Sequence, residues 1–136
     1  MDRCKSPQFR WTVTCAYFAV LSHSLLAPSP LWYLGPMEPA IQEGVTGRFA
    51  DYWQHLVAFQ LLALLVCWAR GPNGFPAVRT CLPTLLGYAI ISEALQALVP
   101  SRSCELRDMA ANLLGVLTGW LMGATLCRWH AQRPVT

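Results

Sequence analysis

The sequence predicts an all-α integral membrane protein, a bundle of about four transmembrane helices forming a single domain over residues 1–136. Apolar residues make up 54% of the chain and charged residues only 12%. Soluble domains are roughly 25% charged. A chain this short cannot bury so much apolar surface in a core of its own, whereas a bilayer solvates apolar side chains directly.

The third observation is the length of the apolar runs, because a spanning helix needs roughly 17 to 25 residues. Four segments approach this length, and each is bounded by charge, glycine or proline, as helix ends should be. They are Phe9 to Ala27, Asp51 to Ala69, Val78 to Val99, and Asp108 to Trp129. The first segment has the basic start of a signal peptide. A cut after Ala27 would put Leu25 where a small residue is required, so we expect the helix to be retained.

The positions of Lys and Arg predict the orientation, because these residues are concentrated on the cytoplasmic side of membrane proteins. Seven of the ten lie in the two tails and the 70–79 loop, and three lie in the other two loops. Trp and Tyr residues near the segment ends have the pattern of an aromatic belt at the membrane surfaces. The bias predicts a multi-pass protein of the cytoplasmic membrane with both termini in the cytoplasm.

Charge and cysteine content narrow the function classes further. The net charge of +3 gives no argument for a nucleic-acid partner. None of the six cysteines forms a CxxC pair or a zinc-like spacing, so no disulfide framework is expected. We expect no cofactor and no metal, although Asp51, His55, Glu93 and Asp108 offer donors that a hard cation would accept.

Three polar pairs lie in or at the start of the predicted transmembrane segments. The members of each pair are three or four residues apart, so they share one helix face. The pairs are Asp51 with His55, Glu93 with Gln96, and Asp108 with Asn112. If both termini are cytoplasmic, the three helix ends that carry these pairs all point to the outside of the cell. A rise of about 1.5 Å per residue places Glu93 roughly 10 Å inside the outer end, with the loop carrying Arg102 closing over the pairs.

Each of these residues also has a purely structural interpretation. Asp51 and Asp108 would serve as N-cap or first-turn acids, which the helix dipole favours. Glu93 is harder to explain in this way, because the run around it is nearly all apolar and an ionisable residue inside a membrane indicates a functional site. We expect Arg102 to be its first partner and His55 its second. A polar network that only pins the bundle is the alternative.

Three glycines in the last segment recur at four-residue spacing, namely Gly115, Gly119 and Gly123. Small residues at this spacing let membrane helices approach closely, so the stripe predicts a packing seam. Asn112 continues the same stripe, which places its polar pair on the packing face and not toward lipid. The same glycines are the surface through which the chain would contact another membrane protein.

These residues also form a combined motif. Its parts are Asp51-x-x-x-His55, then Glu93-x-x-Gln96-x-x-x-Pro100-x-Arg102, then Asp108-x-x-x-Asn112-x-x-Gly115-x-x-x-Gly119. The motif resembles the VanZ-like family of small bacterial membrane proteins, named for an accessory factor in teicoplanin resistance, over about residues 45–125. Family members often carry a lysine soon after the first aspartate, where this chain reads Asp51-Tyr52-Trp53-Gln54-His55. The resemblance implies a multi-helix membrane fold and a bacterial cell-envelope setting.

Three functions fit these observations. The first is binding or transport at the outer leaflet, in which Arg102 and His55 hold an anionic lipid-linked or cell-wall-related ligand. The second is a membrane-embedded enzyme with Glu93 or His55 as an acid–base group. The third is a non-catalytic helper that packs on another membrane protein. We rank them in this order. The residues expected to bind the ligand are Asp51, His55, Glu93, Gln96, Arg102, Asp108 and Asn112.

Overall fold

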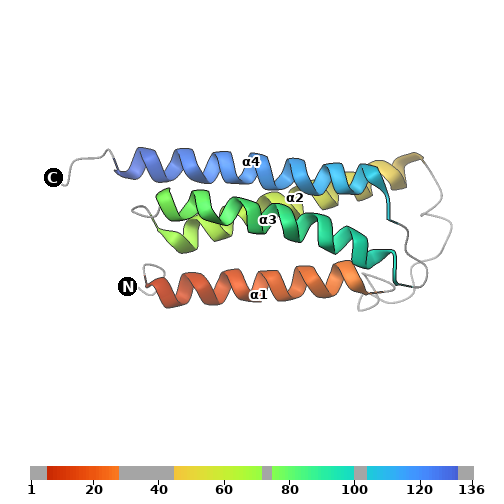
Figure 1. The fold of residues 1–136 in the computed structure, drawn as a ribbon, viewed down its shortest axis with the longest axis horizontal. Helices are drawn as coiled ribbons and strands as arrows, with labels where there is room; N and C mark the ends of the chain where they lie inside the picture. Colours follow the sequence, from red (N-terminus) through yellow and green to blue (C-terminus); the bar gives the residue numbers. More distant parts are fainter. Residues whose placement is uncertain (1–5, 28–44, 72–74, 100–103, 132–136) are drawn as a thin grey trace.

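The computed structural model describes residues 6–27, 45–71, 75–99 and 104–131 (Figure 1). It contains four helices, which are α1 (Pro7–Leu26), α2 (Val45–Arg70), α3 (Phe75–Gln96) and α4 (Leu106–Ala131). No strand occurs in these ranges, so the all-α prediction is confirmed. Two of the helices, over Asp51–Arg70 and Leu106–Trp129, are long and apolar enough to cross a membrane by their length and composition.

The helix bounds differ from the predicted ones at α2 and α3. Helix α2 begins at Val45 and not at Asp51, because hydropathy marks where a helix becomes apolar and not where its backbone begins. Helix α3 ends at Gln96 and not at Val99, whose N–H donates instead to the Gln96 carbonyl in a turn. The proline that follows Val99 in the sequence accounts for this, since the residue before a proline is disfavoured in helix.

The four helices run alternately up and down along the long axis of the molecule (Figure 1). The start of α1 and the end of α4 therefore lie at the same end. Helix α2 packs mainly on α4, α3 also packs on α4, and α1 lies against α2 and α3. The buried core between them is apolar and includes Phe59, Leu62, Ala63, Ala89 and Val116.

The α2–α4 contact is formed by the glycine stripe. A Cβ atom added at Gly115 would collide with the carbonyl oxygen of Leu56, and one at Gly119 with the carbonyl oxygen of Gln60. A Cβ at Gly123 would lie 2.6 Å from the Cys67 sulfur. The packing seam is thus confirmed, and α2 of the same chain occupies the face that these glycines would present to another membrane protein.

Helix α1 is attached to the other helices by side-chain hydroxyl groups. Thr14 donates to the carbonyl oxygen of Leu65 (3.2 Å), and Tyr17 donates to the carbonyl oxygen of Ala58 (3.0 Å). Near the other end of α1, the hydroxyl groups of Ser22 and Tyr88 share a hydrogen bond of 2.9 Å. These bonds cross between helices in an apolar environment, so they fix how α1 is rotated against α2 and α3.

Replacing Tyr17 by phenylalanine is expected to lower the free energy of unfolding by about 1 kcal/mol, because it removes one such bond and leaves the ring in place. Unfolding of the purified protein in detergent measures this change. Tyr52→Phe is the matched control, since the contact that Tyr52 makes with the described residues is an edge contact of its ring with Trp53, which phenylalanine keeps. Equal stability losses in the two variants would contradict the role of the Tyr17 hydroxyl.

Candidate functional site

The charged side chains are separated between the two ends of the bundle. All four carboxylates whose side chains the structure describes lie where α3 ends and where α2 and α4 begin. They are Asp51, Glu93, Glu105 and Asp108, and this end is called the polar end below. Of the five described arginine side chains, only Arg107 lies there. The opposite end carries Arg10, Arg70, Arg79 and Arg128 and is called the arginine end.

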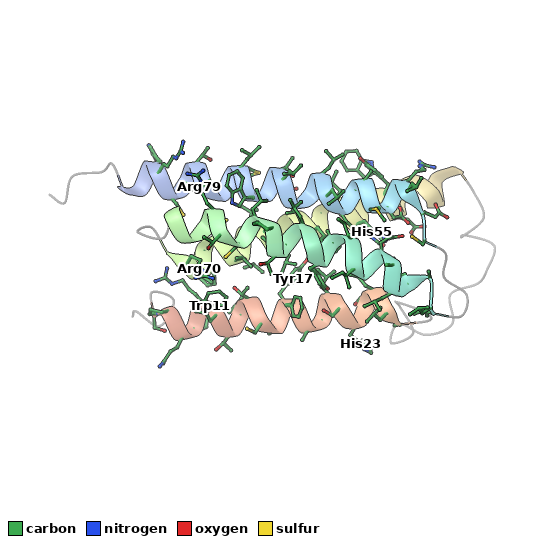
Figure 2. All side chains as sticks on the ribbon, viewed as in Figure 1. Trp11, Tyr17, His23, His55, Arg70 and Arg79 are labelled. Carbon is green, nitrogen blue, oxygen red and sulfur yellow. The ribbon has the colours of Figure 1, made fainter. Side chains whose placement is uncertain are left out.

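The arginine end is also aromatic, as expected of a membrane surface. The Arg70 guanidinium lies over the Trp11 ring, 5.3 Å from its centroid. Arg10 donates to the carbonyl oxygen of Trp68 at 3.2 Å. Figure 2 shows Trp11, Arg70 and Arg79 at this end and His55 toward the other. Basic and aromatic residues near helix ends are typical of the boundary between a membrane and water.

Glu93 is the central residue of the polar end. Its side chain is 0% exposed, although glutamate is almost never fully buried without a partner. One carboxylate oxygen, Oε1, accepts the backbone N–H of Glu105 at 2.9 Å. The other, Oε2, is buried and has no hydrogen-bond partner among the described residues. Glu93 lies three residues before the end of α3, which is about 5 Å along the helix axis.

His55 and Asn112 form the second component of the polar end. Nδ1 of His55 lies 2.9 Å from Oδ1 of Asn112. Because an amide oxygen only accepts, this contact places a proton on Nδ1 and fixes the orientation of the ring. Asn112 is 0% exposed, and its Nδ2 donor is buried without a hydrogen-bond partner in the described part of the chain. The bond joins α2 to α4 directly above the glycine seam.

The charged residues of the polar end are close enough to interact electrostatically. Glu93 interacts with His55, Asp108 and Glu105. Asp108 interacts in turn with Asp51, which lies in the second turn of α2 and is exposed. Asp108 is a first-turn acid of α4 as expected, whereas the first turn of α2 has no acidic residue, so that expectation is wrong for Asp51. The structure therefore brings the three predicted helix ends together.

One of the predicted ligand-binding residues, Gln96, has a different partner. Gln96 is buried, but its Nε2 donates to the carbonyl oxygen of Leu25 at 3.0 Å. That carbonyl is in the last turn of α1, where helix carbonyls lack helical partners, so Gln96 caps α1. Arg102 lies outside the described residues.

Glu105 is a residue of the polar end that sequence reasoning missed. Its backbone N–H binds Glu93, and its carbonyl oxygen accepts from the N–H groups of Asp108 and Met109 at the start of α4. The available signal was its position directly before an apolar helix, where backbone N–H groups have no helical partner. Its side chain adds a further carboxylate at the exposed rim.

The chemistry of the polar end is hydrogen bonding next to negative charge. No group of three or more His, Cys, Asp or Glu side chains in the described ranges is placed to hold a metal ion. What remains is a buried acceptor, Glu93 Oε2, and a buried donor, Asn112 Nδ2, neither of which the described residues satisfy. A polar group that both donates and accepts would complement them.

Comparison with known proteins finds no matching family model, no matching curated protein and no matching solved structure. The function must therefore be inferred from the polar end and from the way in which the bundle presents it.

Proposed function

We propose that this chain is a four-span protein of the bacterial cytoplasmic membrane that binds the headgroup of an anionic lipid-linked or cell-wall-related ligand at its polar end. The role is that of an accessory factor similar to VanZ-like proteins. One observation carries the proposal: Glu93 is fully buried, and one of its carboxylate oxygens has no partner among the described residues. Leaving a buried polar atom unsatisfied costs about 1–3 kcal/mol, more for a charged group, and a ligand would recover this cost.

The exposed apolar side chains support membrane spans for all four helices. Beyond the two apolar helices α2 and α4, the side chain of Val20 on α1 is 64% exposed and that of Ile91 on α3 is 58% exposed. Further large apolar side chains are exposed along each helix. Such a surface is unfavourable in water, and a bilayer would cover it on every side of the bundle.

The separation of charge supports an outward-facing polar end. Four of the five described arginines lie at the arginine end, and positive residues are retained on the cytoplasmic side. This orientation puts both chain termini in the cytoplasm. It also places the polar end at the outer leaflet, where lipid-linked precursors of the cell wall are used.

Positive charge for an anionic group is also present at the polar end. Arg107 is exposed at the start of α4, and His55 is held in place by Asn112. Arginine suits phosphate because its guanidinium donates two parallel hydrogen bonds. Arg102 is proposed as a second cation on the basis of the sequence alone.

Binding of undecaprenyl pyrophosphate to the purified protein in detergent tests this function, with native mass spectrometry as the readout. Asn112→Ala is expected to weaken binding about tenfold, because it removes the buried donor and releases His55. Gln54→Ala is the matched control, since Gln54 is an exposed amide one residue before His55. No binding by the wild type, or equal binding by Asn112→Ala, would contradict the proposal.

A membrane-embedded enzyme is the second candidate, supported by the fixed orientation of His55 near Glu93. Ser92, the described serine next to Glu93, offers no free nucleophile, since its hydroxyl donates to the Ala89 carbonyl of its own helix. Phosphate release from undecaprenyl pyrophosphate measures this activity. If the wild type releases phosphate and Glu93→Gln does not, the enzyme is favoured. If undecaprenyl pyrophosphate binds but is recovered chemically unchanged, the binding role is favoured.

A further inference from the structure

The balance of charge at the polar end does not match a purely anionic ligand. Asp51 and Glu105 are exposed there, Asp108 is half-buried and Glu93 is fully buried. The described side chains at this end of the bundle that can carry a positive charge are Arg107, His55 and, in the last turn of α1, His23. A negative charge brought to this end meets four carboxylates, whereas a positive charge is attracted by them.

The buried donor and acceptor specify the ligand further. Glu93 Oε2 accepts only, so it requires an N–H or O–H group. Asn112 Nδ2 donates only, so it requires an oxygen. Both atoms belong to side chains that are 0% exposed, on α3 and α4 respectively, and both helices contribute carboxylates to the polar end. The complement is a headgroup that carries both a donor and an acceptor.

We infer that the ligand carries a primary ammonium group next to a phosphate, as in a phosphoethanolamine headgroup. The ammonium donates to Glu93 Oε2 and is attracted by the carboxylates of Asp51 and Asp108. A phosphate oxygen accepts from Asn112 Nδ2, and Arg107 lies at the same end to balance the remaining negative charge. This inference rests on the proposed function, and it gives the ligand a zwitterionic headgroup in place of a purely anionic one.

Other cationic groups fit the same site less well. A metal ion would need several coordinating side chains. No group of three or more His, Cys, Asp or Glu among the described side chains is placed to hold one. A trimethylammonium group carries the same positive charge but has no N–H, so it leaves Glu93 Oε2 without a donor. The unpaired carboxylate oxygen therefore predicts a preference for a primary amine over a quaternary one.

The test compares three short-chain lipids that differ only in the headgroup. Dioctanoyl phosphatidylethanolamine, phosphatidylcholine and phosphatidylglycerol are added separately to the purified full chain in detergent, and native mass spectrometry gives each affinity. Phosphatidylethanolamine is expected to bind about tenfold more tightly than the other two, which is the effect of one charge-assisted hydrogen bond. Soluble phosphoethanolamine is added as a competitor in a fourth experiment. If it competes, the headgroup alone is sufficient for binding. If it does not compete, binding requires the lipid chains as well.

Variants connect the preference to individual residues. Glu93→Gln keeps an acceptor for the Glu105 N–H and removes the charge, so it is expected to abolish the preference for phosphatidylethanolamine. Asp51→Asn, on an exposed side chain, reduces the preference about threefold without a risk to folding, as expected for a partly screened charge. Arg79→Gln at the arginine end is the control and leaves it unchanged.

The outcomes separate this inference from the proposed function. If phosphatidylethanolamine and phosphatidylglycerol bind with equal affinity, and Glu93→Gln weakens both equally, the inference of an ammonium group is overturned. The proposed phosphate-binding site would then still stand. A preference that survives both Glu93→Gln and Asp51→Asn also overturns it. Binding of none of these lipids, together with no binding of undecaprenyl pyrophosphate, removes both proposals.

Discussion

Gly119→Ala is expected to lower the free energy of unfolding by about 1–3 kcal/mol, the usual cost of forcing extra atoms into a packed contact. The added Cβ would collide with the carbonyl oxygen of Gln60, which is backbone and cannot rotate away as a side chain would. Helices α2 and α4 must then separate along the seam. The change in the free energy of unfolding is measured by unfolding the protein in detergent and monitoring the loss of its helical circular dichroism signal.

Gly87 provides the matched control for this substitution. It lies inside helix α3, and a Cβ at this position meets nothing within 4 Å. Since alanine favours helix over glycine by about 1 kcal/mol, Gly87→Ala is expected to be neutral or slightly stabilising. If Gly119→Ala were as stable as Gly87→Ala, the close approach of α2 and α4 would be wrong.

Glu93→Gln is expected to stabilise the ligand-free protein and to abolish its preference for phosphatidylethanolamine, which weakens binding of that lipid about tenfold. The substitution retains an oxygen for the Glu105 N–H and removes a buried charge that the described residues only half satisfy. An unsatisfied buried polar group costs about 1–3 kcal/mol and a charged one costs more, so the neutral amide is expected to be the less costly of the two. A residue kept for function at a cost in stability shows this combination.

The same variant separates a ligand site from a structural polar network. If Glu93 only pinned the bundle, Glu93→Gln would lower the unfolding temperature and leave lipid binding intact. Asp51→Asn serves as the comparison, because an exposed carboxylate at the same end is expected to change stability by less than about 0.5 kcal/mol. Paired measurements of unfolding temperature and lipid binding on the two variants give the answer.

The helical fold could be predicted because its signals are local. Apolar runs between helix-breaking residues predicted the four helices. The spacing of Gly115, Gly119 and Gly123 predicted a packing seam on α4, but only the structure identifies α2 as the helix that packs there. The helix ends were less predictable. Hydropathy does not register the polar first turns of α2, and the early end of α3 depends on a turn that closes after Gln96.

The polar end could be predicted only in part. Helical spacing placed His55, Glu93 and Asn112 on inward faces, and the fold brings them to one end of the bundle. The role of Gln96 was not accessible, because it depends on where α1 ends and which carbonyl is exposed there. Glu105 was missed because its contribution to Glu93 comes from backbone N–H, which no residue type reveals.

The central claim is that the bundle crosses the membrane with its polar end outward, and Cys104 tests it most directly. This exposed cysteine lies at the polar end, just before α4. In a variant that keeps only Cys104, a membrane-impermeant maleimide applied to intact spheroplasts is expected to label the protein. Trp129→Cys in a cysteine-free background, exposed at the arginine end, is expected to react only after permeabilisation. Labelling of Cys104 only after permeabilisation, with Trp129→Cys labelled in intact spheroplasts, would contradict the orientation on which the proposed ligand site depends.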